Sequence, residues 1–175
     1  MAIVLDFIRD SIHQQHEAWD QAISDLTPEQ MHFRPNGQGN HIGFIAWHYV
    51  RTEDNLVQFV FQQRKPTVWL AGGYDQRFGL PRTAQGTGMT PEDAARMQLP
   101  SVEQWMGYQQ AVWQATDAWL QTMTEDDLLR SVRIMPFGEI TVMTAVRIPI
   151  VNHGFLHLGQ VGHLRRLQGL KSSDL

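Results

Sequence analysis

Four long stretches of this chain repeat apolar residues every three or four positions, the spacing that buries one face of an α-helix. Between them the sequence shows no convincing alternation of apolar and polar residues, which is the pattern of a half-buried β-strand. Long helices without strands favour an all-α fold, and four of them predict a four-helix bundle. The predicted helices cover residues 2–26, 41–64, 101–123 and 141–168.

Residues 65–100 form a long loop between the second and third predicted helices. The segment is rich in glycine and proline, and only one short helix is predicted in it, opened by Thr90 and Pro91. A connection of this length is usually a lid, a binding loop or a disordered segment. Because Trp69, Tyr74 and Phe78 argue against disorder, we expect a packed loop that covers a site.

Three shorter features complete the predicted organisation. Residues 26–40 are expected to connect the first two helices, with one helical turn after Thr27 and Pro28. Residues 124–140 are expected to form a connection with one helical turn and a short extended piece. Pro149 lies inside the fourth helix, which it should kink because proline has no backbone N–H.

Length, charge and cysteine content limit the function classes. The 175 residues suit a single domain over residues 1–175, and the absence of cysteine means that any metal is held by nitrogen or oxygen. Fourteen basic and eighteen acidic residues, with no basic run, argue against nucleic acid as a partner. The N-terminal residues lack a secretory signal, and no apolar run approaches the length of a membrane span. We therefore expect a soluble cytoplasmic protein that does not bind membranes.

The fourth predicted helix carries two histidines on the stripe that should face the core. His153 and His157 are four residues apart, so they lie on one face and can share a metal ion. An unpaired imidazole at such a position is unfavourable, so each ring should have a partner. Core histidines that are satisfied by hydrogen bonds, without a metal, are the alternative. The complete stripe is Val146, Ile150, His153, His157, Gln160, Leu164 and Leu167.

His48 lies on a comparable stripe of the second helix, which continues to Phe59, and is the predicted third ligand. Helix bundles build metal sites from facing helices, and three protein ligands with open positions are typical of catalytic zinc. The zinc-protease pattern H-E-x-x-H requires a glutamate directly after the first histidine, but that residue is Gly154. A protease of that type is excluded.

Three further polar residues are candidates for the wall of the site. If the first two helices are antiparallel, His16 lies about as deep as His48, so His16 and Glu17 could line the pocket, and His16 could provide a fourth ligand. A histidine satisfied by another partner is the alternative for His16. Gln160, one turn after His157, could orient a metal ligand through a hydrogen bond or could join two helices.

Other residues of the fourth helix have a packing role in this interpretation. Gly154, Gly159 and Gly162 each weaken a helix, which indicates close helix packing or room near the site. His163 is six residues after His157 and points away from the pair. His163, like His13, is therefore expected to be a surface or packing residue.

The sequence GFIAWHYV in the second helix and VNHGFLHLGQVGHLRRLQGL in the fourth resemble the DinB-like superfamily, also called the DinB/YfiT-like metalloenzymes. The similarity extends over nearly the whole chain. It implies a DinB-like four-helix bundle in which His48, His153 and His157 hold a divalent metal, commonly zinc or nickel. Many members have a histidine before the third ligand and an arginine after it, whereas this chain has Leu156 and Leu158.

Characterised relatives in that superfamily include transferases of low-molecular-weight thiols and a thiol-dependent maleylpyruvate isomerase. The resemblance therefore implies a metal-dependent enzyme with thiol S-transferase-like activity on a small-molecule substrate. A hydrolase that uses a metal-bound hydroxide would need the same ligands, and a non-catalytic metal- or ligand-binding bundle is a further alternative. Similar bundles commonly form homodimers, although no exposed stripe in this sequence requires one.

Overall fold

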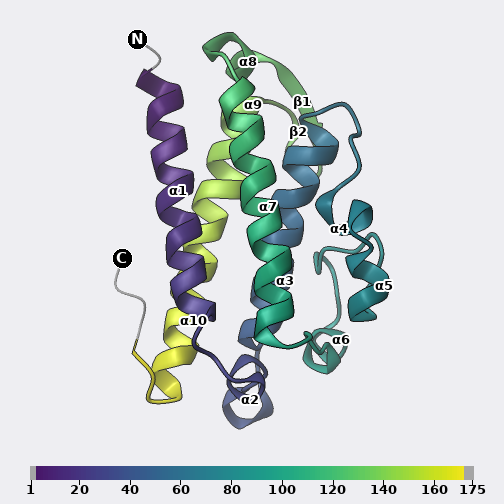
Figure 1. Cartoon of the computed structure of the whole chain (residues 1–175), viewed down its shortest axis with the longest axis vertical. Helices are drawn as coiled ribbons and strands as arrows, with labels where there is room; N and C mark the ends of the chain where they lie inside the picture. The colour runs from purple at the N-terminus through teal and green to yellow at the C-terminus, as the bar shows by residue number, and fades with distance from the viewer. Residues whose placement is uncertain (1–2, 172–175) are drawn as a thin grey trace.

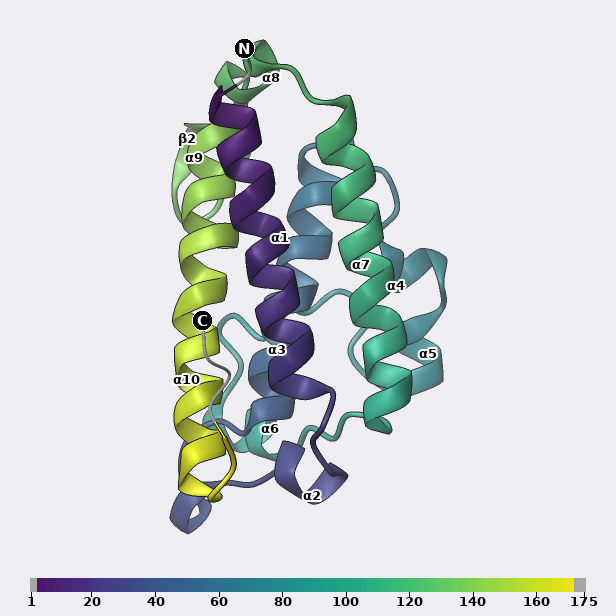
Figure 2. The ribbon, with the colours of Figure 1, turned by 60° about the vertical axis from the view of Figure 1, so that its left-hand side comes forward.

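The computed structural model describes residues 3–171, and within them the regular secondary structure is helical apart from a small two-stranded sheet. Four long helical runs lie side by side (Figures 1 and 2). The run α1 packs against α7 and α10, and α3 packs against the same two helices. The all-α prediction is thus confirmed in outline. The runs are α1 (Ile3–Ile23), α3 (Ile42–Asp54) with η2 (Asn55–Val60), α7 (Val102–Thr122), and α9 (Val142–Val146) with η3 (Arg147–Asn152) and α10 (His153–Leu167).

Polar side chains cap the N-termini of several of these helices by accepting a hydrogen bond from a backbone N–H of the first turn. The sequence signals for the starts of the short helices α2 (Pro28–Met31) and α6 (Pro91–Arg96) are confirmed. His41 caps α3, because its Nδ1 accepts from the N–H of Phe44 at 3.0 Å. Burial lowers the pKa of His41 to about 4, so the ring remains a neutral acceptor. The other capping residues are Thr27, Thr67, Thr90, Ser101, Thr124 and Thr141.

The segment from residue 124 to 141 contains a short helix and a β-hairpin. Helix α8 (Glu125–Leu129) provides the predicted helical turn, and the predicted extended piece is one half of a hairpin of β1 (Ser131–Ile134) and β2 (Gly138–Thr141). The strands are antiparallel, with Ser131 opposite Thr141 and Ile134 opposite Gly138. Four-residue strands are too short to show a clear alternation, which explains why only one extended piece was predicted.

Residues 65–100 contain two short helices that were not predicted, α4 (Val68–Ala71) and α5 (Tyr74–Phe78), besides α6. Asp54 at the end of α3 accepts the N–H groups of Val68 at 2.8 Å and Trp69 at 2.9 Å, and it also accepts from the Tyr108 hydroxyl. These bonds hold the start of α4 from a residue that is distant in the sequence. Because Trp69 is fully buried, the segment is packed as expected.

The core consists of two clusters of buried apolar residues along the helices. The first is rich in tryptophan and includes Trp19, Trp47, Trp105 and Trp113, whereas the second, which includes Ile150, is mainly aliphatic. In the fourth run, His153 lies between Ile150 of the second cluster and residue 158 of the first. No helix within residues 3–171 has both the length and the apolar character needed to cross a membrane.

Two of the long runs contain π-helical turns, η2 after α3 and η3 before α10. Pro149 lies in η3, where its missing N–H makes the regular α-helical bond impossible. The predicted kink therefore takes the form of a wider turn, a feature that is frequent at functional sites. The wider turn of η2 also changes the phase of the side chains, and Phe59, expected on the stripe with His48, is exposed.

The core-facing side of α10 is offset from the predicted stripe by about one residue. Its buried positions include Gly154, Leu158 and Val161, whereas Gln160 and Leu167 are exposed. Close packing at Gly154 orients this face of α10 towards the core. As a result His153 and His157 lie half-buried at the edge of the core, not inside it.

Candidate metal centre

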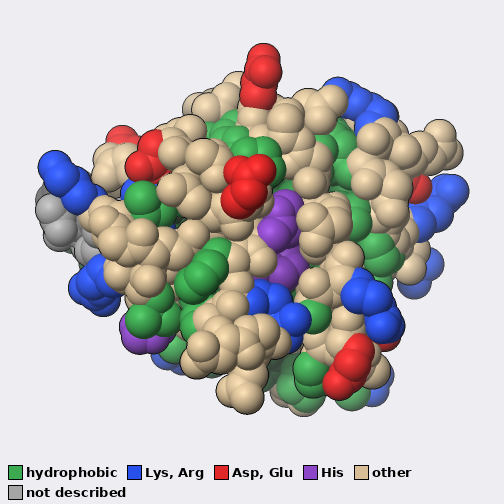
Figure 3. Space-filling model, turned by 90° about the horizontal axis from the view of Figure 1, so that it is seen from below, with side chains coloured by type: hydrophobic (Ala, Val, Ile, Leu, Met, Phe, Trp, Pro, Cys, Tyr) green, Lys and Arg blue, Asp and Glu red, His purple; other side chains and the backbone are tan. Residues whose placement is uncertain are grey.

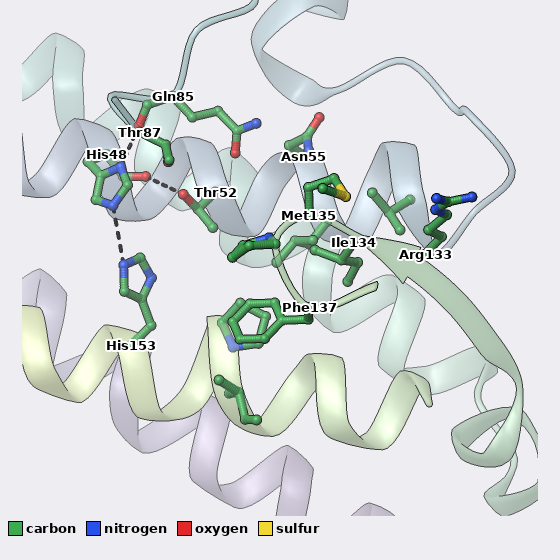
Figure 4. Close-up of a pocket in the computed structure, with 15 residues that line it drawn as sticks. His48, Thr52, Asn55, Gln85, Thr87, Arg133, Ile134, Met135, Phe137 and His153 are labelled. Atoms are coloured by element: carbon green, nitrogen blue, oxygen red, sulfur yellow. Dashed lines mark hydrogen bonds between the residues drawn. The ribbon is translucent and has the colours of Figure 1, made fainter. Parts of the chain in front are cut away.

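Three histidine side chains from two helical runs point at one another. His48 comes from α3, and His153 and His157 come from the first two turns of α10. The Nε2 atom of His153 lies 3.2 Å from Nε2 of His48 and 2.9 Å from Nε2 of His157. Figure 4 shows the rings of His48 and His153 facing each other between the two helices. The structure thus brings together the three residues that were predicted as ligands, with one nitrogen of each within 4.8 Å of the others.

Hydrogen bonds on the far side of the rings fix the positions of their protons. Nδ1 of His48 donates to the backbone carbonyl of Gln85, so Nε2 of His48 carries a lone pair. Nδ1 of His157 donates to Oε1 of Gln160 at 2.7 Å, and its Nε2 therefore also carries a lone pair. His153 can supply at most one proton to the two. This arrangement of facing lone pairs is unfavourable for the chain alone and favourable for a bound cation.

Burial keeps the three imidazoles neutral. It is the largest cause that lowers the pKa of His48 and of His157, and with the neighbouring rings it lowers the pKa of His153 to about 4. The carbonyl of Gln85 and the side chain of Gln160 act in the opposite direction on their partners. Since neutral imidazole is the form that binds metal ions, the cluster is ready to bind one at neutral pH.

The distances between the ring nitrogens also fit a metal ion. Zinc–nitrogen bonds of about 2.0–2.1 Å in a tetrahedral arrangement place two ligand nitrogens about 3.3 Å apart. The observed Nε2 separations of 2.9 and 3.2 Å are close to that value. Imidazole ligands suit zinc, nickel, copper and iron, so the donor set indicates a transition metal without selecting one.

The other predicted wall residues are placed differently. Gln160 bonds to His157, as described above, which is the first of the two roles considered for it. His16 is buried away from the cluster, with its Nε2 2.9 Å from Oε1 of Glu53 and its ring stacked on Trp113. Glu17 is exposed. Within residues 3–171, no fourth histidine, aspartate or glutamate joins the three-histidine cluster.

The contact of His48 with the loop was not predicted. Gln85 and Gly86 belong to residues 65–100, and Gly86 has a φ of +88°, which favours glycine. A Cβ atom at Gly86 would lie 3.0 Å from Cζ of Phe44 and 3.2 Å from Nδ1 of His48. Only a residue without a side chain lets the loop approach closely enough for the carbonyl of Gln85 to hold the imidazole ring.

A buried hydrogen-bond network lies directly behind the histidines and was also not predicted. The hydroxyl of Tyr49 lies 2.5 Å from Oε1 of Gln15 and 2.7 Å from Oε2 of Glu53. Nε2 of Gln15 donates to the carbonyl of Val151 at 2.7 Å. The network joins α1, α3 and η3 immediately before His153, and it therefore holds the start of α10 in place relative to α3.

Gly154 lets α10 approach this network, and we expect Gly154→Ala to lower the free energy of unfolding by about 1–3 kcal/mol. A Cβ at this position would lie 2.3 Å from Nε2 of Gln15 and 2.7 Å from Cε2 of Tyr49, both of which are buried and hydrogen-bonded. Urea unfolding of the two proteins measures the change.

Gly159 provides a matched control on the same helix, because a Cβ there meets no atom within 4 Å. Gly159→Ala should stabilise the protein by about 0.5–1 kcal/mol through the higher helix propensity of alanine. Equal effects of the two substitutions would contradict the packing role of Gly154. Of the two roles expected for Gly159 from sequence, close packing does not apply, since a Cβ there would face open space.

The histidine cluster opens onto a cavity of about 560 Å³. Its lining includes His48 and His153, polar residues of α3 and the loop, and the tip of the hairpin (Figure 4). On the end of the molecule that carries α2 and α6, histidine side chains are also visible in a hollow, and acidic and basic side chains are interspersed around it (Figure 3). Among the described residues in this view, the basic side chains form no continuous surface.

The chain is thus a predominantly helical protein in which three histidines from two helical runs converge in an arrangement that could hold a divalent metal. The chain belongs to the DinB superfamily, whose family model matches residues 11–161. This confirms the resemblance inferred from the histidine motifs.

Among solved structures, a conserved protein from Enterococcus faecalis is similar, with a TM-score of 0.79 and 19% sequence identity. The similarity covers 93% of this chain and 95% of that chain, and at this identity it concerns the fold. No curated protein matches the sequence.

Proposed function

We propose that this protein is a divalent-metal-dependent enzyme of the thiol S-transferase type, with its centre in a four-helix bundle. The observation that carries the proposal is the cluster of His48, His153 and His157, which has no fourth ligand within residues 3–171 and opens onto a cavity. Three protein ligands and an open side are typical of catalytic metal sites, whereas structural sites are closed.

A bound divalent metal would lower the pKa of a small-molecule thiol and so supply a thiolate nucleophile at neutral pH. The chain's own contribution is to hold the three imidazoles neutral and oriented. The Gln85 carbonyl and the Gln160 side chain fix the rings of His48 and His157. The polar side chains of Thr52 and Asn55 line the adjoining cavity and are available to orient a substrate.

Zinc or nickel is the proposed metal, and a low-molecular-weight thiol is the proposed second cofactor. A chain without cysteine has no thiol of its own, so the nucleophile has to come from a small molecule. We further propose a small-molecule acceptor, no nucleic-acid or membrane partner, and a cytoplasmic location. We also propose that the protein can form a homodimer, and gel filtration tests this oligomeric state.

The placement of His16 bears on the non-catalytic alternative. A fourth protein ligand would favour a closed site that only ties helices together. The ring of His16 instead pairs with Glu53, which leaves the three histidines as the donor set. A metal-dependent hydrolase would use the same three ligands, and only the reaction distinguishes it from a transferase.

The test is a conjugation assay with zinc-loaded or nickel-loaded protein. Glutathione, cysteine and coenzyme A are each offered with the fluorogenic electrophile monochlorobimane. We expect at least one thiol to react about tenfold or more faster than without protein. The acceleration should be lost in His153→Ala and kept in His163→Ala, a control histidine on the same helix that lies outside the cluster.

Two outcomes would overturn the proposal. Metal-dependent hydrolysis of 4-nitrophenyl acetate, without thiol conjugation, would identify a hydrolase. The absence of both reactions, in protein that retains one metal ion per chain, would favour the non-catalytic bundle.

A further inference from the structure

Two separate cavities reach the histidine cluster. The larger, of about 560 Å³, touches His48 and His153, and the smaller, of about 320 Å³, touches His48 and His157. Thr87 of the loop, like His48, lines both cavities. Two different molecules can therefore approach the same three nitrogens, each through its own opening.

The larger cavity has mostly apolar walls from three parts of the fold. The π-helical segment η2 contributes Leu56 and Val60, and η3 contributes Ile148 and Pro149. The tip of the hairpin, residues 134–137, forms the third wall, and Figure 4 shows it reaching over the space between the two helical runs. A volume of this size is typical of small-molecule sites, and such walls suit an apolar molecule.

One charged group interrupts this apolar lining. Arg133 of β1 is the only lysine, arginine, aspartate or glutamate among the described residues that line the cavity. It lies on the hairpin, on the side of the cavity away from His48 and His153 (Figure 4). Glu139 is opposite Arg133 in the hairpin register, but no ion pair joins them in the described part of the chain. The guanidinium group is thus available to a ligand.

We propose that the larger cavity binds the electrophilic acceptor, and that this acceptor is a small molecule with an apolar body and a carboxylate at one end. Arg133 binds the carboxylate, because its planar guanidinium matches two oxygen atoms. The apolar walls hold the body and direct its other end towards the histidines. The inference rests on the proposed function and leaves the smaller opening beside His157 for the thiol.

The test measures binding and needs no catalysis. The probes are 4-phenylbutyrate and 4-phenyl-1-butanol, which share the apolar body and differ in the carboxylate. Both are titrated into metal-free and zinc-loaded protein, with isoleucine methyl NMR signals of Ile134 and Ile148 as the readout. The variants are Arg133→Gln, Arg133→Glu and, as a matched control, Arg166→Gln, an exposed arginine that does not line the cavity.

We expect the carboxylate to bind about fivefold to tenfold more weakly to Arg133→Gln than to the wild type, and more weakly still to Arg133→Glu. 4-Phenyl-1-butanol should bind the wild type and the three variants with equal affinity. Arg166→Gln should bind the carboxylate as tightly as the wild type. Because Arg133 is exposed, these substitutions leave the core intact.

Equal binding of the carboxylate to the wild type and Arg133→Gln would overturn the inference, as would the absence of shifts at Ile134 and Ile148. Binding that requires zinc and ignores Arg133 would place the carboxylate on the metal and also overturn it. Since the metal-free titration is independent of thiol chemistry, a failure here is distinct from a failure of the conjugation assay.

Discussion

Replacing Glu53 by alanine is expected to lower the free energy of unfolding by about 3–5 kcal/mol. Glu53 is completely buried and accepts hydrogen bonds from His16 at 2.9 Å, Tyr49 at 2.7 Å and Thr116 at 2.7 Å. Burial alone would raise the pKa of Glu53, but the charge of His16 and these hydrogen bonds hold it below its usual range. Alanine would leave the buried side chains of His16 and Thr116 without this acceptor, and Tyr49 would keep only Oε1 of Gln15.

Urea unfolding at pH 7 measures this change, with two control variants. Glu53→Gln keeps an acceptor oxygen in the same place and should be less destabilised than Glu53→Ala. Glu17→Ala removes an exposed glutamate of α1 and should change stability by no more than about 0.5 kcal/mol. A Glu53→Ala protein within about 1 kcal/mol of the wild type would show that the buried network does not hold α1, α3 and α7 together.

Replacing His153 by alanine is expected to weaken zinc binding by about 100-fold or more. His153 contacts both of the other rings, with its Nε2 3.2 Å from that of His48 and 2.9 Å from that of His157. Its loss leaves two imidazoles, and even the loss of a residue that only orients a ligand costs about 10–100-fold in affinity. Competition with a chromophoric chelator measures the zinc affinity.

His163→Ala is the matched control for this prediction, because His163 lies on the same helix and is exposed outside the cluster. It should bind zinc as tightly as the wild type. Unchanged zinc binding in His153→Ala, or equal losses in the two variants, would mean that the metal binds elsewhere on the chain.

The ligand set could be predicted from sequence because its members follow helix periodicity. His153 and His157 are four residues apart, and His48 recurs at helical spacing with apolar residues. The same reasoning placed part of the core stripe of α10 about one residue out of phase, since Gly154 and Leu158 are buried in place of His153 and His157, although Leu164 is buried as predicted. The close packing at Gly154 was one of the two roles expected for its glycines. Periodicity identifies a face, whereas the exact rotation of a helix depends on its neighbours.

Contacts between distant segments could not be predicted in the same way. Gln85 lies in a loop without periodicity, and its carbonyl reaches His48 only because Gly86 permits a close approach. Helix α4 begins where Asp54 accepts its first N–H groups, a bond between residues of different elements. Gln15 gave a usable signal that was overlooked, as a polar residue beside the buried stripe of α1.

The most direct test of the metal centre is the metal content per chain of untagged protein prepared without a nickel column. Elemental mass spectrometry should find close to one zinc or nickel ion per chain in the wild type and in His163→Ala. His48→Ala and His153→Ala should contain almost none. A wild-type protein that is free of metal and cannot be loaded with zinc or nickel would contradict the account, and the three histidines would then need another explanation.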